Sequence, residues 1–156
     1  MEVEASILKK NDMPHDAHAE ANQSASKGFR RKTILVISDD IHVATLLQFL
    51  LDREGYGVTL MVDGHVAIQY VKQASEPPAM VLLDIMLPIV DGYEVMRTVA
   101  AHPGWGIVPI VILSGRNDES DVVRAFACGA DDYITKPFQL GELLARIKRL
   151  IKENTQ

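Results

Sequence analysis

Met80-Val81-Leu82-Leu83 followed by Asp84 is a run of four apolar residues that ends in an acid, and three other short runs share this arrangement. They are Ile34-Leu35-Val36-Ile37 before Ser38-Asp39-Asp40, Ile110-Val111-Ile112-Leu113 before Ser114-Gly115, and Tyr133-Ile134-Thr135 before Lys136-Pro137. Short apolar runs separated by helical stretches are typical of buried parallel strands. The carboxyl ends of such strands share one edge of an open α/β sheet, where ligands bind. This edge is therefore predicted to hold acids, a hydroxyl and one lysine, which suit a phosphoryl group and a divalent metal.

The composition is that of a soluble chain of one-domain size, with 156 residues, 47% of them hydrophobic and 24% charged. No apolar stretch approaches the ~18 residues of a membrane span, and the N-terminus lacks the apolar core of a secretory signal. The lone cysteine, Cys128, excludes an intramolecular disulfide and fits a reducing cytosol. We therefore predict a cytoplasmic protein with no membrane partner.

Charge is distributed unevenly between the N-terminal segment and the rest of the chain. Residues 1–32 hold six of the 16 basic residues and five of the 21 acidic residues, so ten bases and sixteen acids remain in residues 33–156. The segment thus carries a net charge of +1 and the body −6. An acidic body argues against direct nucleic-acid binding by this part of the chain.

From Thr33 onward, strand-like and helix-like patterns alternate. The predicted strands are 33–38, 57–62, 79–84, 107–113 and 131–135, each followed by a helix, of which the last three lie near 92–101, 118–128 and 139–153. In the first helix the i, i+3, i+4, i+7 spacing is expected to turn five apolar residues inward, namely Val43, Leu46, Leu47, Leu50 and Leu51. The pattern predicts one α/β domain over 33–153, a doubly wound five-stranded parallel sheet with five helices, between a flexible leader (1–32) and a short tail (154–156).

The predicted strand ends bring together groups that bind phosphate and metal. Asp39, Asp40 and Asp84 would repel one another at one sheet edge, and a hard cation such as Mg2+, which binds through one or two carboxylates, would relieve this repulsion. Lys136 would add a fixed positive charge and Ser114 a hydroxyl for a phosphate oxygen. A carboxylate in such surroundings can act as the nucleophile toward a phosphoryl donor and form an aspartyl-phosphate.

Each of these residues also has a plain structural interpretation. Asp40 immediately precedes a predicted helix and suits its N-cap, whereas Ile85-Met86-Leu87-Pro88 intervene between Asp84 and the next helix. Ser114, Lys136 and Tyr133 could serve as a turn residue, a solvated strand end and a packing residue. Their joint occurrence at four strand ends favours a functional site.

Two longer motifs carry a family resemblance. They are Asp84-Ile85-Met86-Leu87-Pro88 with Asp91-Gly92-Tyr93-Glu94, and Gly129-Ala130-Asp131-Asp132-Tyr133-Ile134-Thr135-Lys136-Pro137-Phe138. Both closely resemble the receiver domain of bacterial two-component response regulators, and the resemblance extends from Thr33 to about Lys152. It implies a flavodoxin-like fold with strand order 2-1-3-4-5 and a role in a phosphorelay.

The resemblance also implies roles for individual residues. Asp84 would be phosphorylated by a sensor histidine kinase or a phosphotransfer protein. Asp39 would be a Mg2+ ligand alongside Asp84 and the backbone carbonyl of Met86, with Asp40 adjacent. Lys136 would pair with the acidic pocket, and its peptide bond to the following proline is expected to be cis.

Ser114 and Tyr133 are the implied switch residues, which move inward when the phosphoryl group is present. This movement would alter the face formed by residues 118–153 and so control a downstream effector protein or an output domain. The chain would then be a switch, not an enzyme with turnover. Both a stand-alone regulator and the receiver of a DNA-binding or hybrid protein fit the sequence.

Two departures from the family pattern fall beside the site. Ser38 takes the first of the two usual acidic positions at the end of the first strand, which predicts weaker Mg2+ binding than an aspartate would give. Ile89 stands where many relatives have glycine or a polar residue, so the loop after Asp84 is expected to be stiffer and more apolar.

A third departure concerns a homodimer through the 118–153 face. Val122 takes a helix position that is basic in relatives that dimerise this way, so Glu142 would lack its partner across the interface. Asp132 and Arg146 are expected to remain available for pairing.

Three alternatives share parts of this pattern. A phosphatase of the haloacid dehalogenase type also uses an aspartyl-phosphate, a lysine and Mg2+, but Met86 stands where its general acid would be. A flavin-binding flavodoxin relative would need a Ser/Thr/Gly-rich loop after the first strand. A receiver-like module that never accepts phosphate is favoured slightly by Ser38. The retained Asp84, Ser114 and Lys136 argue against it.

Overall fold

The computed structural model describes residues 30–153, and the folded unit begins at Arg31. The predicted leader and tail lie outside the described residues, except for positions 30–32. Arg31 belongs to the folded unit because its guanidinium pairs with the Asp52 carboxylate at 3.0 Å and donates to the Gly55 carbonyl oxygen. The folded part therefore starts two residues before the predicted boundary at Thr33.

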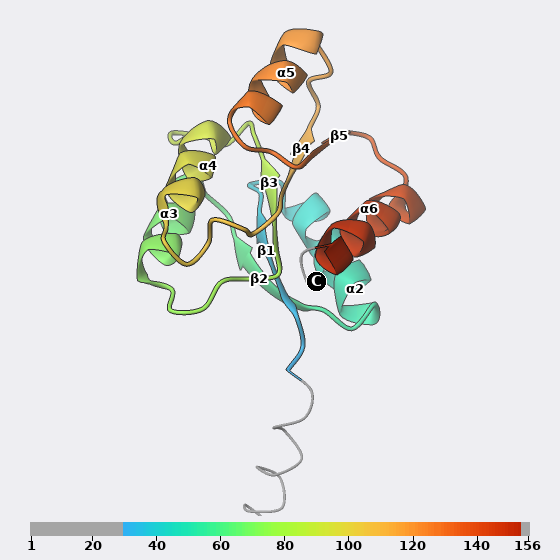
Figure 1. Cartoon of the computed structure of the whole chain (residues 1–156). Coiled ribbons are helices and arrows are strands. Elements are labelled where there is room, and N and C mark those ends of the chain that lie inside the picture. The colour runs from blue at the N-terminus through green and yellow to red at the C-terminus, as the bar shows by residue number, and fades with distance from the viewer. Residues whose placement is uncertain (1–29, 154–156) are drawn as a thin grey trace, which may run out of the picture. The chain divides into compact units, whose positions relative to one another are not determined.

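Five parallel strands form one sheet in the order β2-β1-β3-β4-β5, as the sequence and its family resemblance predict (Figure 1). The strands are β1 (Thr33–Ile37), β2 (Gly57–Met61), β3 (Met80–Asp84), β4 (Ile110–Ser114) and β5 (Asp132–Thr135). The register pairs Ile37 with Leu83, Asp84 with Leu113, and Ser114 with Thr135. Four strands therefore end at nearly the same level, and their next residues meet at one edge of the sheet.

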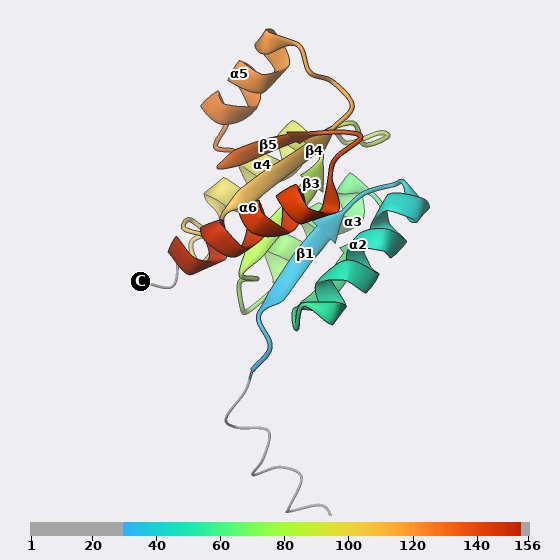
Figure 2. The ribbon, with the colours of Figure 1, turned by 90° about the vertical axis from the view of Figure 1, so that its right-hand side faces the viewer.

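The described helices cover both faces of this sheet. They are α2 (Ile41–Arg53), α3 (Gly64–Gln73), α4 (Gly92–Ala101), α5 (Glu119–Ala127) and α6 (Leu140–Glu153). Helices α2 and α6 lie on one face, in front of the sheet in Figure 2, while α3 and α4 lie on the other. This is the doubly wound arrangement expected when parallel strands alternate with helices.

Two hydrophobic cores follow from the alternation of side chains along each strand. Leu35 and Ile37 of β1 face the core beneath α3 and α4. Ile34 and Val36 face the core beneath α2 and α6, where Leu47 and Ile147 pack against them. Because both faces are covered, the central strands carry apolar side chains on both faces up to their last residue, which is why they appear as unbroken apolar runs in the sequence.

Three aspartates determine where helices begin. The Asp40 carboxylate accepts hydrogen bonds from the amides of His42 and Val43, and Asp63 and Asp91 cap α3 and α4 in the same way. Such N-caps satisfy backbone donors that the helix itself leaves free, and each stabilises a helix by about 1 kcal/mol. The N-cap interpretation of Asp40 is therefore confirmed.

The inward face of α2 differs from the predicted one. Its buried row is Ala44, Leu47 and Leu51, whereas Leu46 is 42% exposed. The cap at Asp40 sets where the helix begins, and packing against the sheet selects the narrow i, i+3, i+7 row as the buried one.

The predicted strand 107–113 begins instead at Ile110. Pro109 has no N–H to donate to a neighbouring strand, so it precedes the strand, although its carbonyl accepts a hydrogen bond from Val81. No helix among residues 30–153 is both long and apolar enough to cross a membrane.

Candidate functional site

Asp84 lies at the centre of the edge where the strands end. It is the last residue of β3, and only 5% of its surface is exposed. One carboxylate oxygen accepts a hydrogen bond from the backbone N–H of Met86 at 3.0 Å, and the other accepts one from the Lys136 ammonium at 2.6 Å. A nearly buried carboxylate needs this pairing, because an isolated buried charge is costly.

Lys136 reaches Asp84 from a neighbouring part of the fold. It follows β5 directly, and its backbone N–H donates to the carbonyl of Ser114 at 2.7 Å, which continues the pairing of β4 with β5. The peptide bond between Lys136 and Pro137 is cis, as predicted. The two residues of the ion pair are 52 positions apart in sequence, so only the sheet brings them together.

The predicted switch residues both contact the loop after β4. Ser114 ends β4, is fully buried, and accepts a hydrogen bond from the backbone N–H of Arg116 through its hydroxyl. The Tyr133 hydroxyl donates to the Arg116 carbonyl oxygen at 2.6 Å. Serine and tyrosine are therefore connected through one loop residue, which the sequence analysis did not single out.

The three polar residues after β1 occupy different environments. The Ser38 hydroxyl is buried and accepts a hydrogen bond from the backbone N–H of Asp40. Asp40 uses its carboxylate as the cap of α2. The exposed carboxylate of Asp39 makes no hydrogen bond with any residue in the described part of the chain. Of these residues, Asp39 alone keeps a free acidic side chain for a cation.

The loop from Ile85 to Asp91 is tightly held at both ends. The Gly92 N–H donates to the Ile85 carbonyl, and a side chain at position 92 would come within 2.9 Å of the Asp84 carbonyl oxygen. A side chain at Gly64, the first residue of α3, would lie 2.6 Å from the Val90 carbonyl oxygen. Glycine at both positions thus allows two helix N-termini to pack directly against this loop.

Ile89 has the most unusual backbone in this loop. Its φ angle is +68°, and the Val90 N–H donates to the Pro88 carbonyl oxygen at 2.7 Å, so Ile89 is the central residue of a γ-turn. Its side chain is 103% exposed. The predicted stiffness of the loop stays a prediction, and a left-handed φ at a β-branched residue could not be inferred from the sequence.

The donor groups at this edge fit a hard divalent cation such as Mg2+. Asp39 follows β1 and Asp84 ends the neighbouring strand β3, and carboxylates are oxygen ligands of the kind that Mg2+ prefers. No group of three or more His, Cys, Asp or Glu side chains suited to a metal occurs in the described part of the chain. A cation bound by two carboxylates would need further oxygen ligands, such as water and phosphate.

The face formed by residues 118–153 contains its own charged cluster. Arg146 donates to both carboxylate oxygens of Asp132, at 3.0 and 2.9 Å, and to Glu142 at 2.8 Å. These hydrogen bonds, to Asp132 first and then to Glu142, raise the pKa of Arg146. Asp132 and Arg146, which were expected to be available to a second subunit, are therefore paired within one chain.

Helix α5 is attached to the rest of the domain by few contacts. Ala125 is its one buried residue, and the Arg124 guanidinium lies 3.8 Å from the centre of the Tyr93 ring in α4. Burial raises the pKa of the Tyr93 hydroxyl, and the Arg124 charge opposes that shift. This cation–π contact is a second link that the sequence analysis missed, because it joins two helices with no shared motif.

Comparison with known proteins identifies the family. The model of the response regulator receiver domain matches residues 34–148. The DNA-binding response regulator MtrA of Mycolicibacterium paratuberculosis is 41% identical over 124 residues, which cover 80% of this chain and 53% of MtrA. The alkaline phosphatase synthesis transcriptional regulatory protein PhoP of Bacillus subtilis is 39% identical over 123 residues, or 79% of this chain and 50% of PhoP. The chain thus spans about half the length of these relatives.

A solved structure supports the same conclusion. The receiver domain of a sensor histidine kinase from Pseudomonas aeruginosa PAO1, with a magnesium ion coordinated in its active site cleft, has a TM-score of 0.71 and 30% identity. The match covers 79% of this chain and 99% of that structure. The chain belongs to the response regulator receiver domain family of two-component systems. The phosphatase and flavodoxin alternatives are therefore wrong.

Proposed function

We propose that Asp84 accepts a phosphoryl group from a phosphohistidine of a sensor histidine kinase or a phosphotransfer protein. An oxygen of the Asp84 carboxylate would form a bond to phosphorus while the phosphorus–nitrogen bond breaks, and the imidazole would leave with that electron pair. The observation that carries this proposal is the position of Asp84, nearly buried at the end of the central strand and held by Lys136 at 2.6 Å.

The surrounding residues suit this transfer. The fixed charge of Lys136 would counter the negative charge of the phosphoryl oxygens. Asp39, Asp84 and the Met86 carbonyl would hold Mg2+, which when bound neutralises charge on the transferred oxygens. The neutral Ser38 hydroxyl in place of an acid makes this site less negative than one with three carboxylates.

The phosphorylated state would act through Ser114 and Tyr133. Both already bond to Arg116, so an inward movement of the serine hydroxyl toward phosphate would also move the loop before α5. Because α5 buries one residue whereas α6 buries four, α5 is the part of the face formed by residues 118–153 that is most easily shifted. Phosphate can shift it only by favouring one of two accessible conformations.

This switch would operate in the cytoplasm and would control a downstream effector protein or an output domain. Transfer to Asp84 and slow hydrolysis of the aspartyl-phosphate make the domain a signalling switch without sustained turnover. A homodimer through residues 118–153 would be one form of output. Its interface would have to compete with the intrachain pairing of Asp132 and Arg146.

The direct test is to incubate the full chain with phosphoramidate and Mg2+ and to measure intact mass. The parent protein should gain one phosphoryl group, and Asp84→Ala should gain none. Asp118→Asn is the matched control, because Asp118 precedes α5 and makes no capping hydrogen bond through its side chain. A phosphoryl adduct that persists in Asp84→Ala would show that the acceptor is another residue.

A further inference from the structure

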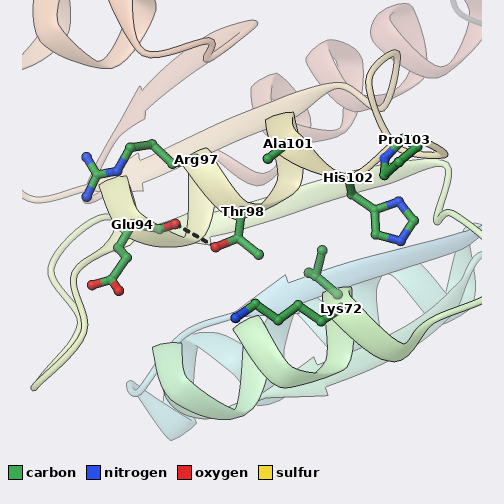
Figure 3. A pocket seen from close by; sticks show the side chains of 8 residues that line it. Lys72, Glu94, Arg97, Thr98, Ala101, His102 and Pro103 are labelled. Atoms are coloured by element: carbon green, nitrogen blue, oxygen red, sulfur yellow. Dashed lines mark hydrogen bonds between the residues drawn. The ribbon is translucent and has the colours of Figure 1, made fainter.

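Helices α4 and α5 differ in how firmly they are fixed to the rest of the domain. Helix α4 buries five residues, Asp91 caps its N-terminus, and within it the Thr98 hydroxyl donates to the Glu94 carbonyl oxygen at 3.0 Å (Figure 3). Helix α5 buries Ala125 alone, and its N-cap residue Asp118 makes no capping hydrogen bond through its side chain. A movement of one of these helices relative to the other is therefore expected mainly in α5.

One side-chain contact links α5 to α4. The Arg124 guanidinium lies 3.8 Å from the centre of the Tyr93 ring, and Tyr93 is 7% exposed. A cation–π attraction acts only within about 6 Å of the ring centre, so a displacement of α5 by a few ångströms would abolish it. Arg53 lies over Phe49 at 5.7 Å, but both of these residues belong to α2. Of the cation–π contacts in the described part of the chain, that of Arg124 is the one that joins two helices.

The loop before α5 connects the same helix to the switch residues. The Arg116 backbone bonds to both switch hydroxyls, those of Ser114 and Tyr133, and its guanidinium lies 3.9 Å from the Asp121 carboxylate in α5. Under the proposed function this loop moves when the phosphoryl group is present. The attachment at Asp121 would transmit that movement to α5, whereas the contact with α4 would resist it.

We propose that the contact between Arg124 and Tyr93 is a latch that favours the unphosphorylated conformation and so opposes phosphorylation of Asp84. The inference rests on the proposed function, because it concerns the same conformational equilibrium. A contact made in one of two conformations shifts their populations by its own free energy. Loss of the Arg124 charge should therefore raise the affinity for a phosphoryl analogue about fivefold, which corresponds to about 1 kcal/mol for an exposed cation–π contact.

The experiment is a nitrogen–proton NMR titration of the full chain with beryllium fluoride in the presence of Mg2+. Beryllium fluoride adds to a carboxylate as a phosphoryl analogue that can dissociate, so the amide signals of α5 report an equilibrium affinity. Arg124→Met should bind it about fivefold more tightly than the parent protein. Tyr93→Phe keeps the aromatic ring and should bind like the parent. Arg53→Met is the matched control, because it removes the same charge from a cation–π contact within one helix, and it should also bind like the parent.

A double-mutant cycle tests whether the two residues act together. Tyr93→Leu should raise the affinity in the parent protein but should give no further gain in Arg124→Met. Dispersed amide spectra would show that each variant is folded. Equal affinities of the parent and Arg124→Met, or independent gains from the two substitutions, would overturn the latch alone. Absence of binding by the parent, or binding that persists in Asp84→Ala, would overturn the proposed function and the latch with it.

Discussion

Asp84 and Asp132 are both nearly buried acids, 5% and 7% exposed, and both pair with a cation, but they are bonded very differently. Asp84 accepts two hydrogen bonds, one from a backbone N–H and one from Lys136. Asp132 accepts three, from the Tyr133 N–H and twice from Arg146, and Arg149 lies 3.8 Å away. The Asp84 carboxylate therefore keeps lone pairs free to accept further bonds, whereas Asp132 already accepts most of the hydrogen bonds that a carboxylate can accept.

The position of each acid within its strand explains this difference. Asp132 begins β5, where the chain arrives from α5 and packs against α6. Asp84 ends β3, where the chain leaves the sheet and the neighbouring strands end at the same level. Neighbouring side chains can therefore fully surround an ion pair at the start of a strand, whereas an ion pair at the carboxyl end of a strand remains accessible to a ligand.

The largest expected effect separates the two cations. Lys136→Met should slow phosphorylation of Asp84 by phosphoramidate by roughly a hundredfold or more, because it removes a fixed positive charge from the transferred group. Arg146→Met should leave the rate within about twofold, since Arg146 contacts no residue of the phosphorylation site. Intact-mass time courses would give the phosphorylation rates of both variants. An equal loss of rate in the two variants would contradict the view that Asp84 is reactive and Asp132 structural.

A smaller effect concerns metal binding beside Asp84. Ser38→Asp should raise Mg2+ affinity about tenfold, because it adds a carboxylate to the oxygen donors already present. Without Mg2+ the same variant should unfold at a lower urea concentration, owing to repulsion among the acids, and Mg2+ should reverse this loss. Isothermal titration calorimetry with Mg2+ would give the affinities. Equal Mg2+ affinity in the two proteins would show that position 38 does not face the cation.

The ion pair between Arg146 and Asp132 should contribute to the free energy of unfolding. Arg146→Met should lower the free energy of unfolding by about 1 kcal/mol, a modest loss because the guanidinium is partly exposed and Arg149 can partly replace it. Urea unfolding followed by circular dichroism would measure it. Lys148→Met, which removes a surface pair with Glu54, is the control and should cost less. A larger loss in the control would place the stabilising network elsewhere.

The smallest effect tests the loop beside the reactive acid. Ile89→Gly should stabilise the domain by up to about 1 kcal/mol, because relief of the left-handed φ outweighs the greater freedom of glycine in the unfolded chain. Ile107→Gly is the matched control, since Ile107 is also an exposed loop isoleucine but has no positive φ. It should be neutral or destabilising, and a similar gain at both positions would mean that backbone strain is not the cause.

Much of the architecture could be predicted because its signals are local. Each central strand is an unbroken apolar run, and each helix has a capping aspartate, a terminating glycine or a periodic apolar face. The error at Leu46 arose because several rotations of α2 fit its apolar residues, and only the sheet beneath it selects Ala44, Leu47 and Leu51.

The site itself was predictable as a set of residues because parallel strands must end at a common edge. That rule predicts that Asp84, Ser114 and Lys136 lie together, and the structure joins the acid to the lysine. The rule could not foresee that Tyr133 bonds to the Arg116 carbonyl, or that Asp132 and Arg146 pair within one chain. Both contacts depend on side-chain distances between elements.

The amino-acid sequence alone determined the parallel α/β class, the family and the residues at the reactive edge, since these follow from local periodicity and from motifs of adjacent residues. The tertiary structure alone decided which carboxylates are free, which are capped or paired, and that Ile89 adopts a left-handed turn. The physical reason is that hydrogen bonding and backbone strain depend on atoms that are distant in sequence and come within a few ångströms only after folding.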